Sequence, residues 1–276
     1  VFESLLTAFG TAGTGGFGFK NDSFASFSPY IQWVVTIFMI LFGVNFNAYF
    51  LLLLRRFRRA ASSEEVRAYF GIILAAVAVI TVNIRSLYGT FGEALRHAAF
   101  QVGSIITTTG FSSCDFDLWP TLAKEVLVLL MFVGACAGST GGGLKLSRVM
   151  MLLKAAFSDM RRVIWPRRVS RLQMEGQRVE QTVIRAVFSY STLYMLLVLA
   201  GTLLISFDGF DTATNFTAAL TCLSNMGPGL GLIGPAGNFS IFSDLSKLLM
   251  SFLMLAGRLE LYPMLVLLMP STWRKK

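Results

Sequence analysis

Three short turns carry the residue types that could coordinate a cation stripped of its water. They are Thr14-Gly15-Gly16-Phe17, Thr108-Thr109-Gly110-Phe111 and Asn225-Met226-Gly227-Pro228. A cation that crosses a bilayer must exchange its water shell for other oxygens, and an extended Thr/Gly run can direct successive backbone carbonyls at one axis. Glycine permits the backbone angles that this requires. One such run is common, but here each of three runs follows a short apolar helix and precedes a long apolar stretch.

The composition is that of an integral membrane protein. Of the 276 residues, 54% are hydrophobic and 14% are charged, and the mean hydropathy is +0.64. A membrane-spanning helix needs ~20 mostly apolar residues. Five stretches qualify, at about 31–54, 69–90, 119–137 continuing past a break to about 157, 182–206 and 245–269.

The placement of charge predicts the orientation of the chain. The net charge is +9, and the basic residues gather in the alternate loops 55–67, 145–185 and 274–276. By the positive-inside bias, these loops are expected on the cytoplasmic side. The opposite loops carry aspartates, at Asp22, Asp115, Asp117, Asp208 and Asp211. This alternation argues against a nucleic-acid-binding face, and no nucleic acid is expected as a partner.

The elements that must hold the turns are short helices at about 1–12, 91–106 and 211–223. Some 16 helical residues reach only about 24 Å, less than the roughly 30 Å hydrocarbon core, so each helix should enter and leave by one face. Irregular backbone at that depth must line water or be buried in protein, which suggests one shared aqueous axis. The negative C-terminal ends of the helices would favour a cation there.

We therefore predict an all-α polytopic membrane protein. Units of span, re-entrant pore helix, filter loop and span would surround a central pore, as in a potassium channel. Residues 1–59 would be a partial second repeat with pore helix, filter and inner span, 60–175 a third and 176–276 a fourth. Because three repeats cannot close a four-fold ring, the missing unit either belongs before residue 1 or lies in another chain. We favour the former and expect a first repeat to be absent from the N-terminus.

A glycine-rich run breaks one apolar span, at Gly138-Ser139-Thr140-Gly141-Gly142-Gly143. Each helical glycine costs about 1 kcal/mol relative to alanine, so the break needs a reason. A phosphate-binding loop is excluded, because Gly143-Leu144-Lys145 does not match Gly-Lys-Ser/Thr. The run is either a packing kink or a flexible plug below the turns.

Arg258 lies within the last apolar stretch. An unpaired charge at that depth would cost at least ~2.5 kcal/mol. Glu260 is two residues away, on a different helix face, so an intrahelical pair is not expected. We expect Arg258 either to hold the 138–143 loop by its carbonyls or to set a positive barrier in the cavity.

The motifs together resemble the Trk/Ktr/HKT superfamily of potassium transporters, and most of all its bacterial Trk membrane subunits. They are TGGFG at 14–18, TTTGFSS at 107–113, GSTGGGLK at 138–145, SNMGPGLG at 224–231 and GRLELYP at 257–263. The resemblance implies potassium uptake through a four-repeat pore with a backbone-carbonyl selectivity filter, gated by loop 138–143 and Arg258. It matches the filter glycines to Gly16, Gly110 and Gly227. It matches the coordinating carbonyls to Thr14 and Gly15, Thr108 and Thr109, and Asn225 and Met226.

The same resemblance implies partners and a location. It suggests a homodimer embedded in the lipid of the cell inner (plasma) membrane, with a cytosolic ring of nucleotide-binding regulatory subunits docked on the basic 145–185 loop. Potassium would be the ion carried, and no organic cofactor is expected. The SNMGP turn at 224–228 departs most from the TTTG pattern.

Other functions stay open at this point. A sodium or mixed-cation transporter of the same fold would use the same carbonyls, and a non-conducting assembly subunit would need no pathway. An enzyme would need converging Ser, His, Asp or metal ligands at depth. The sequence offers no such cluster, and Cys114, Cys136 and Cys222 lack ligand spacing. We therefore expect no enzymatic activity.

Overall fold

The computed structural model describes residues 2–165, 172–259 and 261–273. Glu260 and the basic tail 274–276 lie outside the described residues. The described chain is mostly helical, as predicted, with one small antiparallel hairpin of β1 (Gln173–Met174) and β2 (Gln177–Arg178). The α-helices are α1 (Phe2–Ala12), α2 (Pro29–Phe42), α3 (Phe46–Leu53), α4 (Phe57–Ser62), α5 (Glu64–Ile84), α6 (Phe91–Ile106), α7 (Thr121–Val133), α8 (Leu146–Ile164), α9 (Gln181–Ile205), α10 (Thr212–Ser224), α11 (Asp244–Arg258), α12 (Leu261–Leu268) and α13 (Pro270–Trp273).

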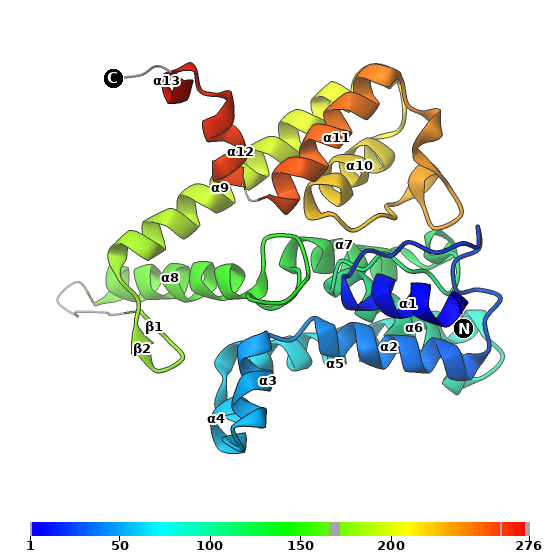
Figure 1. Cartoon of the computed structure of the whole chain (residues 1–276), viewed down its shortest axis with the longest axis horizontal. Coiled ribbons are helices and arrows are strands. Elements are labelled where there is room, and N and C mark those ends of the chain that lie inside the picture. Colours follow the sequence, from blue (N-terminus) through cyan, green and yellow to red (C-terminus); the bar gives the residue numbers. More distant parts are fainter. Residues whose placement is uncertain (1, 166–171, 260, 274–276) are drawn as a thin grey trace.

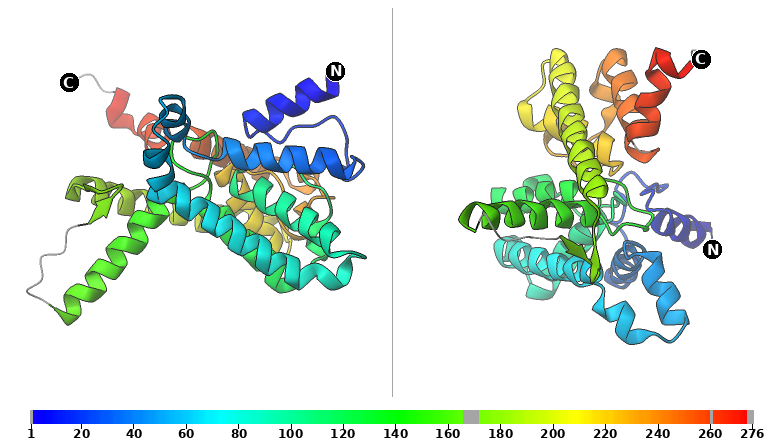
Figure 2. Two further views of the ribbon diagram at one scale, coloured as in Figure 1. Left: turned by 90° about the horizontal axis from the view of Figure 1, so that it is seen from below. Right: turned by 90° about the vertical axis from the view of Figure 1, so that its left-hand side faces the viewer.

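The helices follow one another around the centre of the molecule (Figure 1). Helix α1 packs against α2, α2 against α6, and α6 against α5 and α7. Helix α7 then contacts α10, which lies between α9 and α11. Of the helices that end at the three turns, α6 thus packs against α2, α5 and α7, α10 packs against α7, α9 and α11, and α1 packs against α2. Helix α8 extends away from this assembly in Figures 1 and 2.

Side-chain caps begin the helices where the sequence changes from loop to apolar run. Thr90 accepts from the amide of Glu93 at the start of α6, and Ser63 accepts from the amide of Val66 at the start of α5. Asp211 does the same for α10. Such caps satisfy amides that have no partner within the helix. The caps at Thr90 and Asp211 thus set where the short helices α6 and α10 begin.

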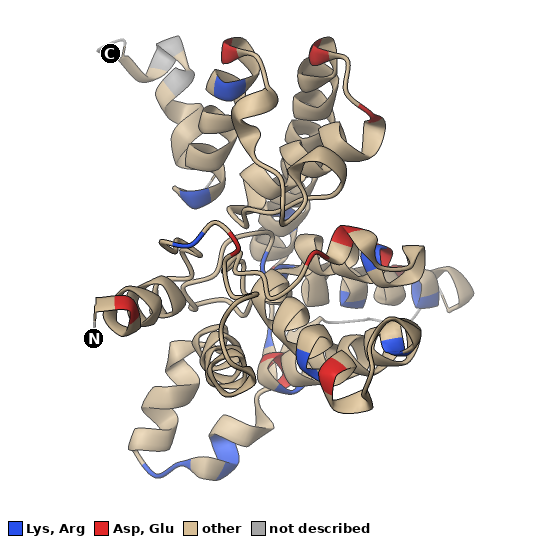
Figure 3. Ribbon diagram, turned by 90° about the vertical axis from the view of Figure 1, so that its right-hand side faces the viewer, with Lys and Arg blue, Asp and Glu red and all other residues tan. Residues whose placement is uncertain are grey.

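Within the described residues, two helical segments are long and apolar enough to cross a membrane. They are Glu64–Leu87, which continues α5, and Gln181–Asp208, which continues α9. The pair α2 and α3 passes the same test only as a bent pair, with an angle of 91° between them. Long stretches of the ribbon carry no charged residue, as Figure 3 shows. These features are consistent with insertion into a membrane.

The stretch predicted as a span at 31–54 is divided into the two helices α2 and α3, which qualify as a membrane span only when they are taken together. The chain turns between α2 and α3, where Asn45 accepts from the amide of Asn47 at 2.8 Å and so begins a new helix. Gly43 lies at the turn, and a Cβ there would be 2.2 Å from the Tyr69 hydroxyl oxygen. Close packing against α5 therefore decides the position of the bend.

Two other predicted apolar stretches are also divided into separate helices. The stretch at 119–157 divides into α7 and α8 around residues 134–145, close to the predicted break. The stretch at 245–269 does not continue as one helix, because α11 ends at Arg258 and α12 begins at Leu261. In contrast, the predicted span at 182–206 agrees with α9 to within a residue.

Candidate ion pathway and the segment beneath it

The three turns found in the sequence lie side by side in the structure. A Cβ on Gly16 would lie 1.9 Å from the carbonyl oxygen of Thr109, and a Cβ on Gly110 would lie 2.1 Å from that of Met226. A Cβ on Gly227 would be 3.8 Å from the Cα of Gly110. Gly110 is therefore in the middle of an arc of three turns, and hydrogen is the only side chain that fits at Gly16 and Gly110.

The three turns share one backbone conformation. Thr14, Thr108 and Asn225 have φ angles of 49°, 56° and 55°, in the left-handed region. The glycine two residues later is also at positive φ in each turn. A left-handed threonine is an outlier, because its branched side chain crowds the backbone. Such strain is concentrated at functional sites in proteins.

Hydrogen bonds at the ends of α1, α6 and α10 explain the shared conformation. The amides of Gly15, Thr109 and Met226 donate to carbonyls five residues earlier, at 2.9, 2.9 and 3.0 Å. The amide of the preceding residue donates to the carbonyl three residues before it in all three turns. This is the Schellman arrangement, which places a left-handed residue at the end of a helix. It satisfies the terminal helix carbonyls internally.

The carbonyls that follow each helix are left without partners. Among the hydrogen bonds of the described residues, none ends on the carbonyl oxygens predicted to coordinate, which are those of Thr14, Gly15, Thr108, Thr109, Asn225 and Met226. Carbonyl oxygens that protein donors do not occupy can replace water around a cation. The arrangement therefore presents oxygen ligands from three helix ends to one region.

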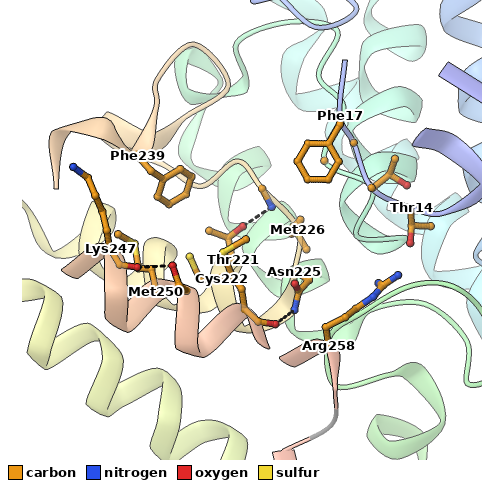
Figure 4. Close-up of a pocket in the computed structure, with 17 residues that line it drawn as sticks. Thr14, Phe17, Thr221, Cys222, Asn225, Met226, Phe239, Lys247, Met250 and Arg258 are labelled. Atoms are coloured by element: carbon orange, nitrogen blue, oxygen red, sulfur yellow. Dashed lines mark hydrogen bonds between the residues drawn. The ribbon is translucent and has the colours of Figure 1, made fainter. Parts of the chain in front are cut away.

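A cavity of about 560 Å³ borders all three turns. Thr14, Gly110 and Asn225 are among its lining residues, and the rest of its wall comes mainly from α10 and α11 (Figure 4). Among the described residues that line it, the charged ones are Lys247 and Arg258. The negative ends of the short helices and the free carbonyls are thus the features of this cavity that attract a cation.

Polar side chains of α6 hold the residues that follow the middle turn. Ser104 donates to the carbonyl of Phe111 at 2.6 Å, and Gln101 donates to the hydroxyl of Ser112 at 2.9 Å. Both Ser104 and Gln101 are fully buried. Our sequence analysis missed them. The signal was the presence of polar residues within the apolar C-terminal part of a short helix, at 98–106.

The glycine-rich segment lies directly against the three helix ends. The amide of Gly142 donates to the Thr108 hydroxyl at 2.7 Å, and the Thr14 hydroxyl donates to the carbonyl of Thr140 at 2.9 Å. A Cβ on Gly142 would lie 2.3 Å from the carbonyl oxygen of Ser224. The segment therefore contacts the ends of α1, α6 and α10 together, and its glycines allow this close approach.

Arg258 joins the same contacts from the end of α11. Its Nη1 donates to the carbonyl of Thr140 at 3.0 Å, and its Nη2 donates to that of Gly13 at 3.5 Å. Figure 4 shows the side chain reaching from α11 toward the side of the cavity where Thr14 lies. These contacts correspond to the first of the two expected arrangements, in which the arginine holds the loop by its carbonyls.

The chain is similar in sequence to known membrane transport proteins. The family model described as TrkH, a cation transport protein, matches residues 1–275. The Trk system potassium uptake protein TrkH of Salmonella typhimurium is 32% identical over 279 residues, which cover 100% of this chain and 57% of that protein. The TrkH of Escherichia coli K12 is 31% identical with the same coverage. The chain thus spans little more than half the length of these curated relatives.

A solved structure shares the fold. The crystal structure of the potassium transporter TrkH from Vibrio parahaemolyticus matches with a TM-score of 0.91 and 31% identity. The match covers 99% of this chain and 59% of the other. This chain therefore belongs to the TrkH family of cation transport proteins.

Proposed function

We propose that this chain forms the greater part of a potassium uptake permease. The three turns would be part of its selectivity filter, with the carbonyls of Thr14, Gly15, Thr108, Thr109, Asn225 and Met226 as ligands and Gly16, Gly110 and Gly227 as the residues that let the turns meet. The observation that carries the proposal is the convergence of three helix-end turns of the same backbone conformation, whose carbonyls accept no hydrogen bond from the described residues. The names of the relatives, which are potassium uptake proteins, support it.

The electrostatics of the cavity support a cation as cargo. Each helix C-terminus carries roughly half a negative charge, and three of them end at the turns. Carbonyl dipoles in a ring can replace the water shell of potassium. A sodium or mixed-cation transporter of the same fold is the alternative, and it is distinguished by selectivity.

We propose that residues 138–143 are the gate and that Arg258 holds them closed. The support is the contact of Thr140 with both Thr14 and Arg258 beneath the turns. Removing the arginine would free the Thr140 carbonyl and loosen the segment. The variant Arg258→Ala should therefore raise potassium flux in reconstituted vesicles. An unchanged flux would reject a gating role for this residue.

The wider assembly is also proposed. Residues 1–59, 60–175 and 176–276 would be the second, third and fourth repeats of a four-repeat pore, and each contains one of the short helices that end at a turn. The protein would act as a homodimer in the inner membrane, with the basic loops cytoplasmic and a ring of nucleotide-binding subunits on the 145–185 region. We expect transport without enzymatic catalysis.

The decisive experiment is rescue of potassium uptake. The full-length protein should restore growth of a potassium-uptake-deficient cell at low potassium. In vesicles it should pass rubidium, a potassium substitute, and exclude sodium. Equal passage of both ions would favour the mixed-cation alternative. No rescue and no flux from a protein that is well folded in the membrane would favour a non-conducting assembly subunit.

A further inference from the structure

A buried carboxylate outside the turns holds the glycine-rich segment from the N-terminal end of α5. Glu65 is 6% exposed. Its Oε1 accepts from the amide of Ala137 at 2.7 Å, on the incoming side of the segment. One side chain of α5 therefore fastens the incoming side of the segment.

The same carboxylate reaches the bend between α2 and α3. Asn45 donates to Glu65 Oε2 at 3.4 Å. The bend is joined to the segment by backbone bonds as well, since the amide of Phe46 donates to the carbonyl of Gly138 at 3.1 Å. Glu65 thus lies where three parts of the chain meet. Its loss would leave partly buried donors without an acceptor, which is costly.

The hairpin β1–β2 contacts the first turn of α5, which carries Glu65. Glu175, at the hairpin turn, accepts from the Ser63 hydroxyl at 2.8 Å and from the amide of Glu65 at 3.1 Å. A carboxylate is favourable at a helix N-terminus, where free amides carry partial positive charge. Lys154 of α8 pairs with Glu64 and also donates to a backbone carbonyl of the hairpin at 3.0 Å. The hairpin is therefore fastened to the first turn of α5 and to α8.

We propose that Glu65 is a positioning residue for the segment 134–145 and that Glu175 of the hairpin sets it. Movement of the hairpin on the cytoplasmic face would then loosen the segment beneath the turns. This inference rests on the proposed gating function. It adds a path by which a change at the basic 145–185 region reaches the gate, through Glu175, the first turn of α5 and Glu65.

Flux measurements on the full-length protein in vesicles test the coupling. Glu175→Ala and Glu65→Gln should each raise rubidium flux by roughly tenfold, the shift expected for loss of one hydrogen bond to a charged group. The double variant should not exceed the larger single effect, because both changes act on one path. Glu180→Ala removes an exposed carboxylate five residues beyond Glu175 and should leave the flux unchanged. Glu65→Gln keeps the side-chain volume, so a folding failure of Glu65→Ala would not affect the test.

A second readout follows the segment itself. In a background without the three native cysteines, Ser139→Cys should react faster with a thiol reagent when Glu175→Ala is added, while the melting temperature stays near that of the parent. Unchanged labelling together with unchanged flux in both glutamate variants would overturn the inference. If Arg258→Ala raises flux while the glutamate variants do not, this inference alone fails. If Arg258→Ala is also silent, the gating function of the segment fails.

Discussion

Gly110 is the position at which the proposed pathway is most sensitive to one added carbon. It is in the middle of the arc, its φ is +88°, and a Cβ there would lie 2.1 Å from the carbonyl oxygen of Met226. The added Cβ and the Met226 oxygen both belong to turns, so their overlap can be relieved only by movement of the backbone. Gly110→Ala therefore perturbs two of the three turns together.

The size of the effect follows from this contact. An ordinary contact between carbon and a neighbouring atom is about 3.5 Å or more, so the turns must separate by more than 1 Å. A left-handed residue with a Cβ adds roughly 1–2 kcal/mol of backbone strain. Coordination by carbonyls depends on how closely they surround the ion. We expect rubidium flux to fall by at least about tenfold, which corresponds to roughly 1.4 kcal/mol.

The assay is rubidium and sodium flux in vesicles, with Gly92→Ala as the matched control. Gly92 is in α6, the helix that leads to the same turn, and a Cβ there would meet no atom within 4 Å. The control should transport normally and be slightly more stable, because alanine favours helix. Normal flux and normal selectivity in Gly110→Ala would refute the assignment of this turn to the pathway.

Three further changes test neighbouring features. Thr108→Val keeps the shape of the side chain but leaves the amide of Gly142 without its acceptor, at a cost of about 1–3 kcal/mol. Potassium flux should therefore rise as the gate loosens. An unchanged flux would show that the Thr108 hydroxyl has no part in gating. Asn225→Val should lose more flux than Asn225→Gly, because glycine accepts the left-handed conformation and valine does not; equal losses would contradict this. The hydroxyl and amide of Thr214 hold the pKa of Asp211 below its usual range. The stability that this carboxylate contributes should be complete above the ordinary aspartate pKa and disappear as pH falls through the lowered value, whereas thermal melts of Asp211→Asn should lack that step.

Much of the architecture could be predicted from local pattern. Apolar length predicted helices and membrane insertion, because burying backbone polar groups in lipid requires internal hydrogen bonding. The spacing of Gly16, Gly110 and Gly227 after short apolar helices predicted three equivalent turns. The glycines at 138–143 predicted the break between α7 and α8. Each of these signals depends on residues that are neighbours in the chain.

Contacts between distant segments could not be predicted in this way. The bend between α2 and α3 depends on close packing of Gly43 against Tyr69, and an apolar run carries no sign of it. Arg258 had two expected arrangements, and its bond to the carbonyl of Thr140 depends on where α11 lies relative to the glycine-rich segment. Glu65 gave no signal beyond a charge near a helix start.

The class of fold, the three turns and the glycine-rich break could all be inferred from the amino-acid sequence, because backbone propensity and hydrophobic length act over a few consecutive residues. The tertiary structure decided that Gly16, Gly110 and Gly227 form one arc and that Thr140 lies beneath it. It also decided which buried charge reaches which backbone group. Those outcomes depend on the packing of helices that are far apart in the chain, where a shift of an ångström makes or removes a hydrogen bond.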